Sequence, residues 1–79
     1  MSRDEDLSQY DPWIDAVCTE LGVDRARVDV DLVLAVAGRV AHRVARPMAP
    51  VSTFVLGLAL GSSGASLGDL RDRLLAVPS

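Results

Sequence analysis

Arg46-Pro47-Met48-Ala49-Pro50-Val51-Ser52-Thr53-Phe54-Val55-Leu56-Gly57-Leu58-Ala59-Leu60 is the segment on which the architecture of this chain depends. Its two prolines mark a corner, because Pro47 disfavours helical angles at the residue before it and ends one helix, whereas Pro50 suits the first turn of the next. From Val51 onward the segment is apolar on every side, as is typical of a helix in the middle of a domain. The segment therefore predicts a sharp corner followed by a central helix over 50–61.

Two helices are expected to pack against this central one. Over 30–46 the apolar residues recur at spacings of three and four, which outweighs the strand-like alternation over 28–36 because no partner strand exists elsewhere in the chain. Over 66–77, Ser66 followed by Asp69 approximates a capping box. The expected apolar faces are Val33, Val36, Ala37, Val40, Ala41 and Val44 in the first of these helices and Leu67, Leu70, Leu74 and Val77 in the second.

A further helix is expected at the start of the fold, over 11–22, with Asp11 as its N-cap and Gly22 at its end. Its spacing predicts that Trp13 closes the core; the alternative is that Trp13 and Tyr10 anchor an interface, where aromatic residues are enriched. The full apolar stripe of this helix is Trp13, Ile14, Val17, Cys18 and Leu21.

The length of the chain limits it to one domain. With 79 residues, of which 49% are hydrophobic and 24% charged, it is too apolar for intrinsic disorder and too interrupted by charge for a membrane protein. Residues 1–10 are acidic without periodicity and predict a flexible tail, and residues 11–79 predict the domain. The expected fold is all-α, a four-helix orthogonal bundle with a central apolar third helix. Gly57 and Gly61 in that helix would let another backbone approach closely, and so small a core would gain from a second copy in a homo-oligomer.

Charge is distributed unevenly along the chain. Residues 1–31 carry nine acids and three arginines, a net charge of −6, whereas residues 32–79 carry two acids and five arginines, a net charge of +3. The acidic total of −3 argues against nucleic acid as a partner. The start of the chain lacks a secretory signal, Cys18 is the single cysteine, and no apolar stretch reaches the roughly 18 residues that span a bilayer. These features predict a cytoplasmic protein that does not enter a membrane.

A basic stripe near the corner provides the candidate site. Four basic side chains of the second helix fall at spacings of three and four, on one face, and two hydroxyls follow at the start of the next helix. Arginines and helix N-termini both attract anions such as phosphate or carboxylate. The alternative is that the cations only complement the dipole at a helix C-terminus. The candidate anion-binding or interaction residues are Arg39, His42, Arg43, Arg46, Ser52 and Thr53.

No residue set in the sequence predicts catalysis, a metal site or a cofactor. His42 has no second histidine to complete a metal site, and Cys18 lies in an apolar stripe where thiols are usually inert. We therefore expect a non-catalytic protein without a cofactor, which binds a protein partner, a second copy or a small anionic ligand.

One family resemblance covers nearly the whole chain from Trp13 onward. It rests on Trp13, on Leu21-Gly22-Val23-Asp24, on Val28-Asp29-Val30-Asp31 and above all on the segment from Val40 to Phe54. In these residues the chain resembles the small bacterial helical domain of unknown function that occurs alone or fused behind a MobA-type molybdenum-cofactor guanylyltransferase.

The resemblance implies a non-catalytic accessory role near the formation of molybdopterin guanine dinucleotide. Guanylyltransferase chemistry would then belong to a separate nucleotide-binding domain, and fusion associates the two domains without assigning a function to this one. The alternative is a general helical interaction or self-association domain without a link to that pathway.

Overall fold

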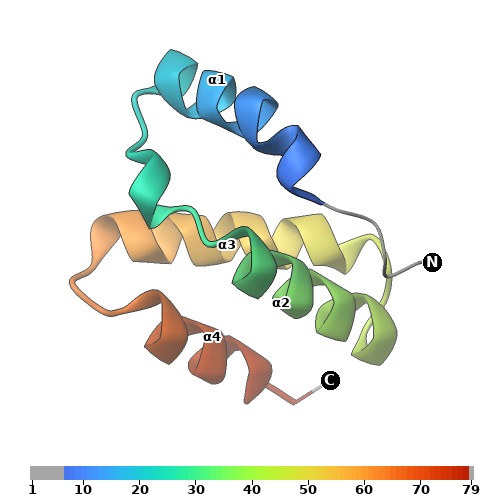
Figure 1. Cartoon of the computed structure of the whole chain (residues 1–79). Helices are drawn as coiled ribbons and strands as arrows, with labels where there is room; N and C mark the ends of the chain where they lie inside the picture. Colours follow the sequence, from blue (N-terminus) through green and yellow to red (C-terminus); the bar gives the residue numbers. More distant parts are fainter. Residues whose placement is uncertain (1–6, 79) are drawn as a thin grey trace.

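The structure of the protein is a computed structural model that describes residues 7–78. Within these residues it contains no strand. The four helices are α1 (Asp11–Leu21), α2 (Val30–Arg43), α3 (Met48–Ser62) and α4 (Leu67–Leu75), and two short 3-10 helices are η1 (Leu7–Tyr10) and η2 (Arg25–Arg27) (Figure 1). The predicted all-α domain of four helices is therefore confirmed.

The corner between α2 and α3 shows how the two prolines act. α2 ends at Arg43 and not at the expected Arg46, because a longer helix would need an N–H at position 47 to bond the Arg43 carbonyl, and Pro47 has none. α3 begins at Met48, two residues earlier than expected, because N–H groups of a first turn have no partner within the helix and Pro50 is tolerated there.

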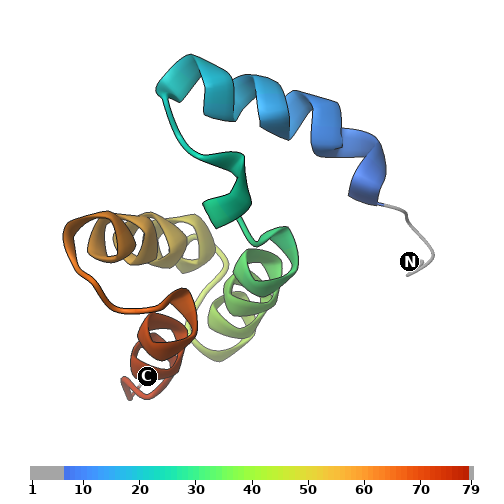
Figure 2. The same ribbon diagram turned by 60° about the vertical axis from the view of Figure 1, so that its left-hand side comes forward.

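Three of the helices share one small apolar core. Val36 and Val40 of α2, Leu56 of α3 and Leu70 of α4 are buried. α3 contacts both α2 and α4, and so it is central to this group as predicted (Figures 1 and 2).

The apolar faces of α2 and α4 are shorter than expected. Val44 and Val77, predicted to face the core, are 55% and 63% exposed. α2 ends one residue before Val44 and α4 ends two residues before Val77, so neither side chain is held on the buried face of its helix.

α1 stands apart from that core. Within residues 7–78 its close backbone contacts are with η1 and η2 and none are with α2, α3 or α4, and Figure 2 shows it separated from the other three. Cys18 is buried and Ile14 and Val17 are half-buried, but Trp13 and Leu21 are each 69% exposed. The prediction that Trp13 closes the core is therefore wrong, because α1 does not lie on the core.

Arg25 holds α1 against η2. Its Nε donates to Asp15 Oδ1 at 2.9 Å, its Nη2 donates to Asp11 Oδ1 at 3.4 Å, and its Nη1 donates to the Val28 carbonyl at 3.0 Å. We call these three contacts the Arg25 clasp. Asp11 is not the N-cap that the sequence predicted, because Tyr10 takes that position and Asp11 is already helical. Polar contacts therefore set the position of α1 at its linker.

Local signals fix the other helix ends. Ser66 Oγ accepts a hydrogen bond from the Asp69 N–H at 3.1 Å, as expected for the start of α4. Gly22 ends α1 with a positive φ of 70°, the left-handed conformation that favours glycine. Of the expected 1–10 tail, residues 1–6 lie outside the described residues, and residues 7–10 form η1. None of the described helices is long and apolar enough to cross a bilayer.

Candidate functional site

The predicted basic stripe is divided by the early end of α2. Arg39, His42 and Arg43 lie on α2, whereas Arg46 lies in the corner beyond it, and all four residues are exposed. Arg43 Nη1 donates to the Leu75 carbonyl at 3.0 Å, which ties the end of α2 to the end of α4. Arg43 thus has a structural contact that the sequence did not indicate.

The two predicted hydroxyls bond to the backbone of their own helix. Ser52 Oγ donates to the Ala49 carbonyl at 3.0 Å. Thr53 Oγ1 lies 3.1 Å from the carbonyl oxygens of Ala49 and Pro50. Both hydroxyl groups are therefore already engaged with the first turn of α3.

The backbone at the start of α3 is also engaged. The N–H groups of Met48 and Ala49 each donate at 3.0 Å, to the carbonyls of Ala45 and Arg46 in the corner. Residues 52 and 53 lie past the first four residues of α3, where N–H groups bond within the helix. The anion site stays a prediction, and it now depends mainly on the basic side chains.

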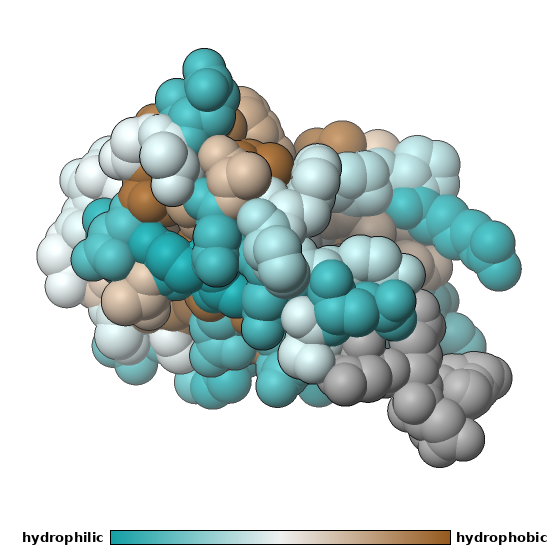
Figure 3. All heavy atoms as spheres, turned by 45° about the horizontal axis from the view of Figure 1, so that its top comes forward, coloured by the Kyte–Doolittle hydropathy of each residue, from teal (hydrophilic) through white to brown (hydrophobic). Residues whose placement is uncertain are grey.

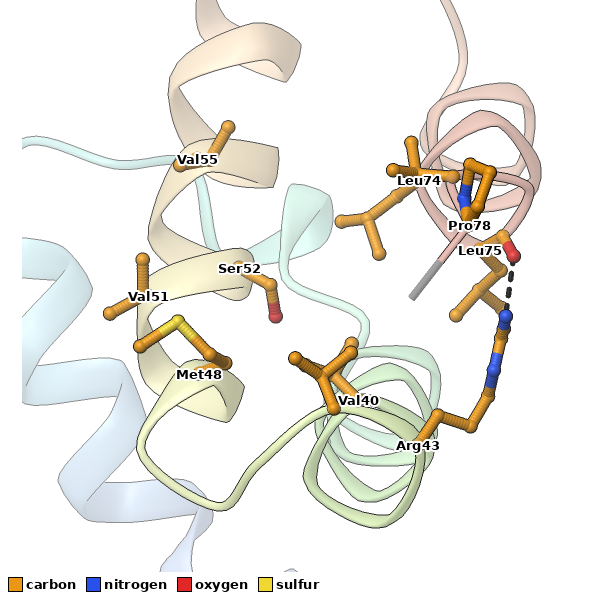
Figure 4. A pocket seen from close by; sticks show the side chains of 11 residues that line it. Val40, Arg43, Met48, Val51, Ser52, Val55, Leu74, Leu75 and Pro78 are labelled. Atoms are coloured by element: carbon orange, nitrogen blue, oxygen red, sulfur yellow. Dashed lines mark hydrogen bonds between the residues drawn. The ribbon is translucent and has the colours of Figure 1, made fainter.

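Arg43 and Ser52 both line an apolar pocket between the end of α2, the first turns of α3 and the end of α4 (Figure 4). Its volume is about 340 Å³. Thr53 lies at a different pocket beside η2, and Arg39 lies at a third beside Arg71. Apart from Arg43 and Ser52, the first pocket is lined by Val40, Val44, Met48, Val51, Val55, Leu74, Leu75, Val77 and Pro78.

Sequence reasoning missed this pocket because its walls come from segments about 30 residues apart. Val40 and Leu74, on opposite walls, were each predicted to be core residues of their own helices. Only the packing of α4 beside α2 brings them to one pocket. The sequence does indicate that α2 and α4 each have an apolar face, but it does not indicate that a pocket remains between these faces.

α3 presents a second apolar face, directed away from the core. Val51, Phe54, Val55 and Leu58 follow the spacing i, i+3, i+4, i+7 and are 50–67% exposed. We call these four residues the α3 stripe. Val51 and Val55 also line the apolar pocket, so the pocket and the stripe are continuous, and Val51 points away from α4 in Figure 4. A helix that is apolar on every side therefore has only one side covered.

Further apolar surface surrounds the stripe. The sequence predicted that another backbone would pack closely on Gly57 and Gly61. A Cβ added at either glycine would have no atom from another part of the chain within 4 Å, so no other segment of the chain packs on them. The indole of Trp13 and the side chain of Leu21 on α1 are exposed as well. In Figure 3 hydrophobic side chains reach the surface among hydrophilic ones over the face that carries α1.

A family model, described as a domain of unknown function (DUF6457), matches residues 5–77. The chain belongs to this family. Because the match includes α1 as well as α2, α3 and α4, both exposed apolar surfaces are part of the DUF6457 domain. Comparison with curated proteins and with solved structures gives no match.

The described part of this DUF6457 domain offers no group of three or more His, Cys, Asp and Glu side chains that is suited to a metal ion. Cys18 is buried in α1, whereas His42 is exposed near the end of α2. The described residues instead present exposed apolar surface on α3 and α1.

Proposed function

We propose that this DUF6457 domain is a non-catalytic protein-interaction module. The observation that carries the proposal is the α3 stripe, in which four large apolar side chains on one helix face are exposed together. Single exposed apolar residues are normal on proteins, whereas contiguous patches mark interaction surfaces. Helices that bind partners commonly do so through the i, i+3, i+4, i+7 spacing that the stripe has.

We further propose that the module acts as an accessory in molybdenum-cofactor assembly. The support is the resemblance of the segment over 40–54 to the domain fused behind MobA-type guanylyltransferases. In such an arrangement the guanylyltransferase supplies the chemistry, and this chain supplies a contact surface or holds an anionic intermediate. A self-association domain outside that pathway is the alternative.

A photo-crosslinking experiment in cells tests the interaction. p-Benzoylphenylalanine replaces Phe54 in the α3 stripe, and in a matched control it replaces Arg73, an exposed residue of α4 that lies outside the stripe. We expect a covalent protein adduct from position 54 and little from position 73. Guanylyltransferase peptides in the adduct would support the accessory role, whereas an adduct that contains only peptides of this chain would support the interaction module and favour the self-association alternative. No adduct from position 54 would refute the interaction module itself.

A further inference from the structure

We propose that the partner covering the α3 stripe is a second copy of this chain. In this arrangement α1 of each copy lies on the α3 stripe of the other. The inference rests on the proposed function and deepens it by naming the partner. It follows from three observations on the described residues, namely an uncovered helix, a matching area and opposite charges.

The first observation is that the chain has two apolar surfaces without a cover. α1 has no close backbone contact with α3 in the described structure, and it leaves Trp13 and Leu21 exposed. The Arg25 clasp holds α1 to η2, and Arg27 Nη2 of η2 donates to the Leu60 carbonyl of α3 at 3.5 Å, so α1 would have to break one of these contacts to swing onto its own α3. An α1 from another copy reaches the stripe with the clasp intact.

The second observation is the size of the exposed surface. The α3 stripe, the flanking Met48, and the Trp13 and Leu21 side chains together expose on the order of 700 Å². Stable protein interfaces commonly bury about 800 Å² on each partner. The apolar surface on one chain is therefore close to what one side of a dimer needs.

The third observation is charge complementarity. α1 carries three acids and no base, and with Arg25, which pairs with two of these acids, it has a charge of −2, whereas residues 32–68 carry three arginines and no acid, a charge of +3. Arg46 lies in the corner directly before the helix that bears the stripe, and it is exposed. Opposite charges favour the docking of α1 on this part of a second copy and disfavour the docking of α1 on another α1.

Two-fold symmetry satisfies both surfaces at once. Each copy has one α1 and one α3 stripe, so a single two-fold axis places both pairs in contact and leaves neither open. A closed dimer is therefore expected, not a chain of copies.

The experiment measures mass and the fluorescence of Trp13, the single tryptophan. The mass measured by light scattering of the full chain should rise with concentration from that of the 8.4 kDa monomer to twice that value. Emission of Trp13, which is 69% exposed in the single chain, should shift to the blue over the same range as the indole becomes buried. Added salt should raise the dissociation constant several-fold because it screens the opposite charges.

Two variants and a control locate the interface. Phe54→Asp should raise the dissociation constant at least a hundredfold, since the dimer would lose two buried rings and bury two charges. Leu58→Asp should act in the same direction and serves if the first variant folds poorly by circular dichroism. Leu34→Asp is the control, because Leu34 is similarly exposed but lies on α2, outside both the stripe and the apolar pocket. It should leave the dissociation constant within a few-fold of that of the wild type.

Each contrary outcome is distinct. A monomer at high micromolar concentration, or a dimer that survives both stripe variants, would overturn the second copy as the partner. In a mixture of light and heavy isotope-labelled chains, some cross-links between Trp13 and the α3 stripe must join a light chain to a heavy chain. If every such cross-link joined residues with the same label, α1 would close on its own α3. If a different protein is captured at position 54 while the pure chain stays monomeric, the proposed function stands and this inference fails. If nothing is captured, both fail.

Discussion

Leu56 and Leu58 provide a matched pair for testing which face of α3 is buried. They are the same residue type on the same helix, but Leu56 is 4% exposed and Leu58 is 58% exposed. Truncating Leu56 to alanine removes three buried carbons at about 0.8 kcal/mol each and leaves a cavity, so the free energy of unfolding should fall by about 3 kcal/mol. Leu58→Ala should lower it by less than about 1 kcal/mol, because most of the side chain is already in water and alanine favours the helix.

The assay is urea unfolding followed by far-ultraviolet circular dichroism at low protein concentration. A chain of this length has a total stability of roughly 4–12 kcal/mol, so the Leu56→Ala loss is a large share and needs to be measured at low temperature. Equal losses for the two variants, or a larger loss for Leu58→Ala, would refute the assignment of the two faces.

Repeating the measurement at high protein concentration connects this pair to the proposed dimer. A dimer stabilises the folded chain by mass action, so the wild type should become more stable as concentration rises. The cost of Leu58→Ala should rise with it, because Leu58 belongs to the interface, whereas the cost of Leu56→Ala should stay the same. A Leu58→Ala cost that is independent of concentration would contradict the placement of Leu58 in a dimer interface.

Three smaller perturbations test the remaining assignments. Arg25→Ala should speed amide hydrogen exchange across α1 and leave exchange in α3 unchanged. Equal exchange rates across α1 in the wild type and in the variant would show that the clasp does not position α1. Gly22→Ala should lower the free energy of unfolding by about 1 kcal/mol because of the positive φ, as judged by urea unfolding against Gly64→Ala, since Gly64 has a negative φ. If the basic residues bind an anion, phosphate should raise the melting temperature of the wild type and not that of Arg46→Ala, with sodium chloride at equal ionic strength as the control. A flat wild-type response would end that hypothesis.

The sequence by itself determined the helical elements and most of their ends. The spacing of Val36 and Val40, the capping serine at position 66 and the glycine at position 22 each act within a few residues, so their effects do not depend on the rest of the fold. Near Pro47 and Pro50 the helix ends differ from the predicted ones by two or three residues. Proline limits the backbone conformations that are allowed there, but several of them remain, and the sequence does not indicate which one forms.

Only the tertiary structure decided what each apolar face touches. Amphipathic spacing shows that Trp13 and Leu56 each belong to an apolar face, but not whether that face meets a neighbour in the same chain. The Arg25 clasp, made by residues 10 and 14 positions apart, holds α1 against η2, and α1 has no close backbone contact with α3. The contact between Arg43 and the Leu75 carbonyl joins positions 32 apart and completes the apolar pocket. Such contacts depend on how whole helices pack, which local spacing does not encode, and they leave Trp13 and the α3 stripe at the surface.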